Sequence, residues 1–347
     1  MTPPIFFFIP NSTEWSELPT DIQQYWAWMR AQRHLAWWGQ FNWTLQTYLR
    51  LKSEGFSCGL ARQMPADGIV VAHRDFLPND LRPSRRQFLV CLLADRNRTG
   101  SKGQHPYAQI HVVQNPRDDL LTHASAQSRA YYMPQWPQPG LLPRDPNRGD
   151  RFEVAAFFGY EHNLASELRN PQWTAQLRDL GLSWHSVPRH EWHDYRHVDV
   201  VVAVRKFGYG DFSHKPPSKL YNCWHAGVPA VLGAESAFRA NRRSDLDYLE
   251  VQSLDETAVA IRRLRDDQDL RQRMMRNGCA RAQDVQPARL AEQWQRLFTE
   301  GIVPAYAEWA HASPWVRAMF RHRRAWAFHR RRVAPEVSDQ PGCVCRR

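Results

Sequence analysis

The sequence has little cysteine and no long apolar run. Its six cysteines, at positions 58, 91, 223, 279, 343 and 345, lack the dense spacing of a disulfide-stapled domain. Cys343 and Cys345 form a C-x-C pair without a second pair or a neighbouring histidine, so no metal site is expected. No stretch reaches the ~18 apolar residues of a membrane-spanning helix, and the N-terminus lacks a signal-peptide pattern. We therefore expect a reduced, cytoplasmic protein.

Acidic residues are scarce relative to basic ones, with 35 against 46 and a net charge of +11. The imbalance peaks in residues 316–332, which hold seven arginines, four large apolar side chains and no acid. We predict a basic helical tail whose arginines, from Arg317 to Arg332, contact an anionic membrane surface. A solvated tail without a partner is the alternative. Nucleic acid could meet the same charges but is not the expected partner.

The apolar pattern predicts two α/β domains, each large enough for its own core. Strand-like runs occur at 5–9, 57–61, 69–73, 87–94, 108–113, 152–158, 184–187, 200–204, 228–232 and 248–251. Helix-like patterns occur at 21–35, 40–53, 166–180, 219–226, 253–265, 267–284 and 289–309. The predicted divisions are an N-terminal acceptor-side domain 1–133, a Pro-rich linker 134–150, a C-terminal domain 151–288, a helix 289–310 crossing back, and a tail 311–347. Six tryptophans between positions 15 and 43 are best explained as core packing.

The most informative segment is K-P-P-S-K-L-Y-N-C-W-H-A-G-V-P-A-V-L-G, residues 215–233. Ser218 is placed to cap a short helix, Gly227 to end it, and the apolar run that follows predicts a strand covered on both faces. Free N–H groups at the helix start, flanked by Lys215 and Lys219, favour a phosphate or diphosphate. The segment therefore predicts an anion site at the edge of a parallel sheet.

The same residues resemble the donor-binding region of GT-B-type bacterial glycosyltransferases, which build surface polysaccharides. The resemblance continues through D-Y-L-E-V at 247–251 and the helix that begins near Ser253. It implies two Rossmann-like domains facing a cleft. It also implies transfer of a sugar from a nucleotide-diphosphate-sugar, without a further cofactor, to a glycan or lipid-linked acceptor. The enzyme would then work in the cytoplasm, at the inner face of the membrane.

Cations near the predicted anion site are the candidates for stabilising a diphosphate leaving group. We rank Lys219 first, then Arg205 at the end of a strand, then Lys215, with Ser218 beside them. For Arg205 the alternative is a structural ion pair with Asp199 or Asp211.

Many retaining enzymes of the resembled class carry two carboxylates eight residues apart, but His214 and Asn222 occupy the corresponding positions. Asn222 is expected at a ribose hydroxyl, with His214 as an uncharged replacement. Glu235 and Ser236 are expected at sugar hydroxyls, although an acid there also suits helix capping. Gly159 would let the backbone approach the donor closely. Trp192 is expected either to stack on a base or to cover the sheet end.

An inverting transferase needs a general base from the N-terminal domain. His73 ends a predicted strand and titrates near neutrality, and Asp95 ends the next. Asp245 and Asp247 match a metal-binding D-x-D, but their place before a short strand argues against metal. Two alternatives to transfer stay open: a nucleotide-sugar epimerase on the same fold, and a non-catalytic scaffold that binds nucleotide-sugar or membrane.

Overall fold

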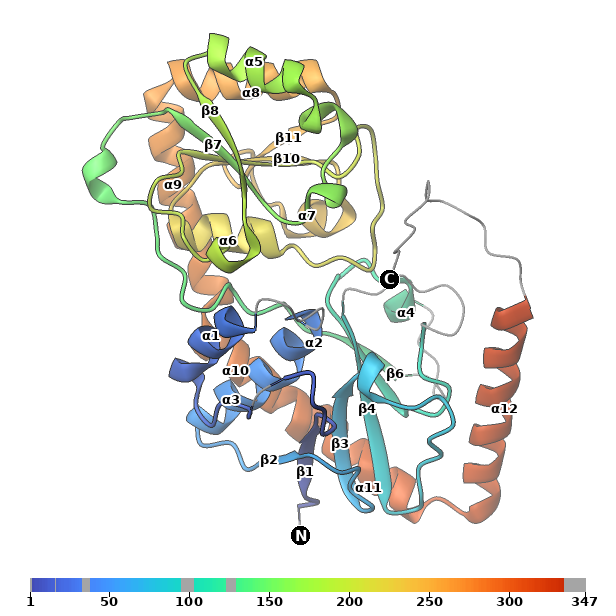
Figure 1. The fold of residues 1–347 in the computed structure, drawn as a ribbon. Helices are drawn as coiled ribbons and strands as arrows, with labels where there is room; N and C mark the ends of the chain where they lie inside the picture. The colour runs from blue at the N-terminus through green and yellow to red at the C-terminus, as the bar shows by residue number, and fades with distance from the viewer. Residues whose placement is uncertain (1, 16, 33–37, 95–102, 123–128, 334–347) are drawn as a thin grey trace.

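The computed structural model describes the chain except residues 1, 16, 33–37, 95–102, 123–128 and 334–347. The described residues form two parallel β-sheets, one in each half of the chain, with helices around both (Figure 1). Two separate apolar cores accompany them. The prediction of an α/β fold is confirmed.

The first sheet has six parallel strands in the order β2-β1-β3-β4-β5-β6. Its strands are β1 (Ile5–Phe8), β2 (Gly59–Ala61), β3 (Gly68–His73), β4 (Gln87–Leu93), β5 (Ile110–Val113) and β6 (Arg129–Tyr132). Strands β3, β4 and β5 are buried at every position, which is why they read as continuous apolar runs. The edge strand β6 is half-buried and was not predicted, because R-A-Y-Y carries no clear period.

The second sheet repeats this arrangement with five strands in the order β11-β10-β9-β7-β8. Its strands are β7 (Val154–Phe158), β8 (Ser183–Val187), β9 (Val200–Ala203), β10 (Ala230–Gly233) and β11 (Leu249–Val251). In each sheet the strand order reverses once, between β1 and β3 and between β7 and β9. Ligands of such doubly wound sheets bind beyond the carboxyl ends of the strands at that reversal.

The predicted helical segments contain helices with shifted ends, segment 40–53 is divided into two helices, and two short helices, at 119–122 and 236–241, were not predicted. Those of the two halves are α1 (Ile22–Ala31), α2 (Trp38–Trp43), α3 (Leu45–Ser53), α4 (Asp119–Thr122), α5 (Pro171–Asp179), α6 (Ser218–Ala226), α7 (Ser236–Asn241), α8 (Leu254–Asp266) and α9 (Gln268–Ala282). Core packing is the role of Trp26 and Trp43, which are 9% and 1% exposed. Trp28 packs half-buried on the same core, and Trp37 lies outside the described residues.

The chain returns to the first half after α9. Val285 belongs to the second core and Leu290 to the first, so the crossing takes only a few residues. The predicted single helix over 289–309 consists of α10 (Pro287–Arg296), a π-helical segment Leu297–Ile302 and α11 (Val303–His311). Pro304 lacks the N–H that a continuous α-helix needs, which accounts for the change of hydrogen bonding there.

The last helix, α12 (Pro314–Val333), lies along the first domain (Figure 1). Three of its arginines bind backbone carbonyls. Arg317 donates to the end of α11, Arg321 donates to Pro83 O at 2.7 Å, and Arg324 donates to His105 O at 3.0 Å. These three guanidinium groups therefore hold the helix to the domain rather than facing outward.

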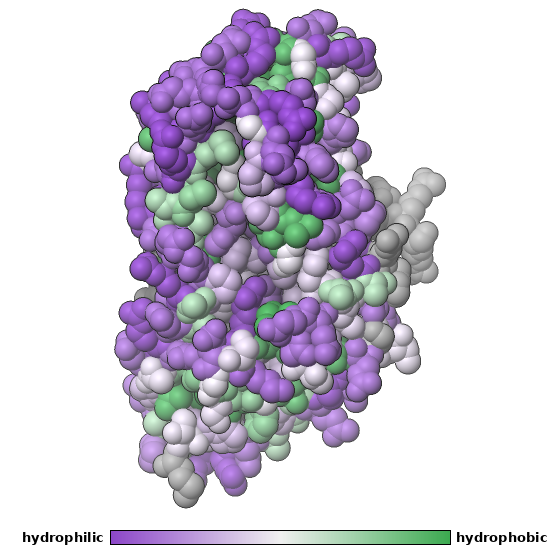
Figure 2. All heavy atoms as spheres, turned by 90° about the vertical axis from the view of Figure 1, so that its left-hand side faces the viewer, coloured by the Kyte–Doolittle hydropathy of each residue, from purple (hydrophilic) through white to green (hydrophobic). Residues whose placement is uncertain are grey.

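No helix among the described residues is both long enough and apolar enough to cross a bilayer. The face shown in Figure 2, away from α12, is mainly hydrophilic with small separate apolar patches. This agrees with the mean hydropathy of −0.63.

Candidate functional site

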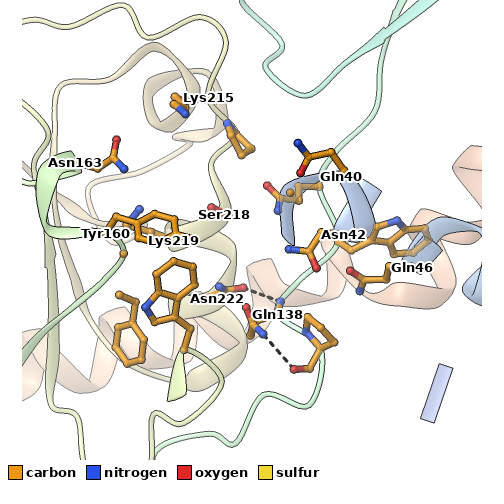
Figure 3. A pocket seen from close by; sticks show the side chains of 18 of the residues that line it. Gln40, Asn42, Gln46, Gln138, Tyr160, Asn163, Lys215, Ser218, Lys219 and Asn222 are labelled. Carbon is orange, nitrogen blue, oxygen red and sulfur yellow. Dashed lines mark hydrogen bonds between the residues drawn. The ribbon is translucent and has the colours of Figure 1, made fainter. Parts of the chain in front are cut away.

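A cavity of about 390 Å³ lies between the two halves, at the carboxyl ends of β7 and β9. One wall comes from α2 and α3, a second from the linker around Gln138, and the third from the second domain (Figure 3). It therefore occupies the place where the strand order of the second sheet predicts a ligand. None of the described residues that line it is Asp or Glu.

The wall from the second domain is cationic. Arg205 follows β9, while Lys215, Ser218 and Lys219 line the same wall at the start of α6. The Lys219 ammonium lies 5.4 Å from the centre of the Phe157 ring. The structure thus brings together the four residues predicted to hold the diphosphate.

The start of α6 differs from the prediction in one respect. Ser218 is the first helical residue, and Pro217 occupies the N-cap position without a side-chain cap bond. The predicted capping role of Ser218 is therefore wrong. Pro217 offers no side-chain oxygen, so no side-chain cap closes this end of α6.

Arg205 is held by an acid that the sequence did not suggest as its partner. Its Nε donates to Glu235 Oε2 at 3.0 Å, and Glu235 is only 3% exposed. Asp199, one of the expected partners, instead accepts from Arg144 and Arg148. Glu235 precedes α7 without making a side-chain cap bond, so its described contact is the one that orients Arg205.

Loop 211–215 joins the cationic wall to the first domain. Gln114, at the end of β5, donates to His214 O at 2.9 Å. The next residue, Asn115, donates to Ser236 Oγ at 3.0 Å. Ser236 in turn donates to Asp211 O. His214 and Ser236, both predicted to meet the donor, thus contribute to the described contact between the domains.

Asn222 and Gly159 both line the cavity. The Asn222 side-chain oxygen accepts from Gln138 N at 2.9 Å (Figure 3). A Cβ on Gly159 would lie 2.7 Å from Phe157 Cζ, so this turn has no room for a side chain. Trp192 also lines the cavity, while its indole N–H donates to Val187 O at 2.9 Å. It therefore covers the sheet end and forms part of the wall.

The wall from the first domain carries amides that sequence reasoning missed. Gln40, Asn42 and Gln46 come from α2 and α3. The Asn42 side-chain oxygen accepts from Tyr25 OH at 2.7 Å, and Gln40 Nε2 donates to Asp75 Oδ2 at 2.7 Å. Asn42 is thus left with donors and Gln40 with its carbonyl, a pairing that suits hydroxyl groups.

Of the two predicted bases, the structure describes only His73. His73 ends β3, is 1% exposed and is not a lining residue. Its Nε2 donates to Ala94 O at 3.1 Å, and its Nδ1 accepts from Asp75 N at 3.2 Å. Asp75 in turn holds Gln40 at the cavity wall. Asp95 lies outside the described residues.

The D-x-D pair is split between surface and interior. Asp245 pairs with Arg242 at 2.9 Å, whereas Asp247 is 3% exposed and accepts from Arg281 and Asn277. In the part of the chain that the structure describes, no three His, Cys, Asp or Glu side chains are grouped to hold a metal ion.

Comparisons with known proteins bear on the fold. No family model matches the sequence, and no curated protein does. The structure resembles HepE of Anabaena, solved with UDP and glucose, at 10% identity and a TM-score of 0.50, covering 86% of this chain and all of HepE. TarM of S. aureus is 8% identical, with a TM-score of 0.49, and the match covers 73% of this chain and 59% of TarM. Sucrose-phosphate synthase of Thermosynechococcus elongatus is 12% identical, with a TM-score of 0.45, and the match covers 68% of this chain and 74% of that protein.

The likeness to HepE spans both domains of this chain, from the first sheet to the second. The prediction is therefore confirmed for the fold: this chain consists of two parallel-sheet α/β domains and shares its fold with HepE.

Proposed function

We propose that the protein is a glycosyltransferase that moves a sugar from a nucleotide-diphosphate-sugar to a glycan or lipid-linked acceptor in cell-surface polysaccharide synthesis. The observation that carries the proposal is the convergence of Arg205, Lys215 and Lys219 on an interdomain cavity at a topological switch point. Preorganised cations at that place stabilise the charge that builds on a departing diphosphate. The likeness of fold to HepE, solved with UDP, makes a UDP-sugar the first donor to test.

The two walls suggest a division of labour. The cationic wall would hold the diphosphate, with Asn222 at the ribose and Trp192 at the base. The amides of α2 and α3 would orient a hydroxyl acceptor between them, and closure would keep water from the donor. His73 and Asp95 stay the proposed bases. In the described geometry His73 contacts Asp75, which in turn holds Gln40 at the cavity wall.

We further propose that the protein works in the cytoplasm and meets the inner face of the membrane through the side of α12. Non-catalytic nucleotide-sugar binding is the second candidate, favoured by the absence of Asp and Glu from the described cavity lining. A nucleotide-sugar epimerase would need acidic groups at the sugar, and this lining does not favour it.

A thermal-shift series with UDP, GDP, CDP, ADP and TDP tests the donor site. One nucleotide should raise the melting temperature by mass action. Lys219→Ala should weaken its affinity about tenfold or more, because hydrogen bonds to charged groups contribute roughly 1.5–3 kcal/mol. Lys206→Ala is the matched control: Lys206 is exposed on the same segment but does not line the cavity. Equal behaviour of the two variants, or no shift with any nucleotide, contradicts the site.

Turnover then separates the candidates. A transferase releases nucleoside diphosphate only when an acceptor hydroxyl is supplied, an epimerase converts the sugar without release, and a scaffold does neither.

A further inference from the structure

A second cavity, of about 330 Å³, lies at the opposite end of the first sheet. Phe88, near the start of β4, and Arg129, the first residue of β6, form its floor with α11 and α12 around them. The nucleotide cavity is lined by residues that follow β7 and β9, whereas this one is lined by residues near the amino ends of β4 and β6, and the two share no lining residue. The two cavities are therefore separate sites.

Most of its wall is apolar and comes from the two helices. Trp309 and Phe320 pack edge to face with ring centroids 5.3 Å apart, and Met319 lies beside them in the lining. At the mouth, Trp315 is 70% exposed and Val316 is 49% exposed. Leaving these side chains in water is unfavourable, and their gathering around a cavity marks a place where apolar matter binds.

The cavity also contains one buried polar group without a partner. The side-chain oxygen of Gln109 accepts from Leu89 N at 2.7 Å, but its Nε2 has no hydrogen-bond partner among the described residues, and Gln109 is only 7% exposed. A buried unpaired donor costs about 1–3 kcal/mol. An acceptor oxygen on a ligand in the cavity would remove that cost.

Positive charge lies next to this donor. Ile110 pairs with Arg129 in the sheet, which places Gln109 beside Arg129 at one end of the cavity. Arg129 bonds to Glu308 at 2.6 Å in a partly exposed pair of the kind that contributes little stability. Arg323, exposed on α12, lines the cavity as well. One end thus offers the Gln109 donor, the Arg323 cation and the Arg129–Glu308 ion pair, and the other offers aromatic and aliphatic surface.

Part of the apolar surface of α12 faces outward, while Phe320 of the same helix packs against the first core. Arg317, Arg321 and Arg324 bind the domain, and helical spacing puts Trp315, Met319 and Trp326 on the opposite side. Trp326 is 57% exposed. Exposed tryptophans beside basic residues are typical of helices that lie at a membrane interface.

We propose that this cavity binds an acyl chain of an anionic membrane phospholipid. The chain packs against Trp309, Met319 and Phe320, Gln109 donates to an ester oxygen, and Arg129 faces the phosphate. This deepens the membrane contact proposed above and rests on it. The lipid is an anchor: it enters at the strand ends opposite the nucleotide cavity and leaves that cavity to the reacting substrates.

Vesicle sedimentation tests the proposal with the full chain. Wild type should bind phosphatidylglycerol vesicles in preference to phosphatidylcholine vesicles. Met319→Glu, which puts a carboxylate into the cavity, should lower partitioning about tenfold or more, since burying an unpaired charge is costly. Ala318→Glu is the matched control, with the same charge change on an exposed neighbour outside the lining. It should lower partitioning by no more than about fivefold, as a single charge near an anionic surface does.

Phospholipids brominated on the acyl chain give a second readout. They should quench tryptophan fluorescence in wild type, and Trp315→Phe should lose part of that quenching. Equal losses in Met319→Glu and Ala318→Glu would overturn the cavity while leaving the membrane contact. No binding by wild type would remove both. If deletion of residues 334–347 strengthens vesicle binding, the tail occupies the cavity and not a lipid. If wild type forms a dimer that Met319→Glu dissociates, a second copy of the chain occupies it. The UDP-induced thermal shift should be the same in all these variants, so failure here is distinct from failure of the donor site.

Discussion

Asn115 Nδ2 donates to Ser236 Oγ at 3.0 Å, joining the end of β5 in the first sheet to the start of α7 in the second. Asn115 is fully buried, and Ser236 is 5% exposed. Together with the bond from Gln114 to His214 O, this contact fixes the segment that carries Lys215 into the cavity. The position of a proposed donor cation thus depends on the first domain.

Asn115→Ala should therefore weaken nucleotide binding although residue 115 does not line the donor cavity. Loss of a buried hydrogen bond of this kind costs about 1–3 kcal/mol, part of which should appear as a weaker affinity of up to about tenfold. Isothermal titration with the nucleotide found by thermal shift measures it. Asn11→Ala, at the end of β1 on the surface, is the control. Unchanged affinity in Asn115→Ala would show that the contact is structural only.

Gly159→Ala should destabilise the fold and narrow the donor cavity. The added Cβ would lie 2.7 Å from Phe157 Cζ, and overpacking of this kind typically costs about 1–3 kcal/mol. Urea unfolding measures the loss. Phe157→Leu shortens the side chain that blocks the site, so the double variant should recover part of the free energy lost in Gly159→Ala. Additive effects of the two substitutions would contradict the steric explanation.

Stability should depend on pH through His105. Burial, aided by the charges of Arg74 and Arg324 and opposed by the bond to Pro78 O, lowers the pKa of His105 to about 4. In the unfolded chain its pKa is about 6.5, so the unfolded state binds a proton first as the pH falls. The stability contribution is complete above pH ~6.5 and is lost progressively toward pH ~4.

Between pH 7 and pH 5 this single group should reduce the free energy of unfolding by about 2 kcal/mol. His105→Asn keeps an acceptor for the Tyr107 N–H, which His105 Nδ1 binds at 3.2 Å, and cannot titrate. Urea unfolding at the two pH values should show a shallower pH dependence in this variant. Since His111 is also buried with a lowered pKa, some dependence should remain. An unchanged slope would exclude His105 as its source.

The parts of the site that follow from local rules could be predicted. Residues 215–233 contain a helix start, a glycine stop and a buried strand in close succession, so the placement of Lys215 and Lys219 depended on few assumptions. Arg205 could be placed at a strand end, but its partner Glu235 lies 30 residues away on a neighbouring connection, and the acids nearest in sequence were the wrong choice. Asn115 follows β5, but its partner Ser236 lies 121 residues away on the other domain, where no local pattern points to it.

The amides Gln40 and Asn42 were missed because nothing in a Trp-rich helical segment distinguishes a cavity-facing amide from a solvated one. Their orientation is set by Tyr25 and Asp75, which tertiary packing brings to them. For the arginines of α12 the sequence pattern was clear, but the contacts of three of them were not the predicted ones. A run of like charges predicts a surface that meets anions, yet Arg317, Arg321 and Arg324 find backbone carbonyls whose positions no local pattern reveals.

The buried Asp247 should be structural rather than a metal ligand. Arg281 and Asn277 donate to its side chain, as do the backbone N–H groups of Arg243 and Ser244, and together these bonds outweigh burial and hold its pKa below the ordinary value. Asp247→Asn removes one of the two carboxylates that face Arg281, the other being that of Asp284, and it weakens four hydrogen bonds to a buried carboxylate, so it should cost about 1–3 kcal/mol. Thermal unfolding measures this loss. Asp245→Asn, at the exposed surface, should cost less than about 1 kcal/mol in stability.

Incubation with EDTA should leave both the melting temperature and the nucleotide turnover of wild type unchanged. A loss of turnover that Mn²⁺ or Mg²⁺ restores would give the D-x-D pair a role that its contacts do not suggest.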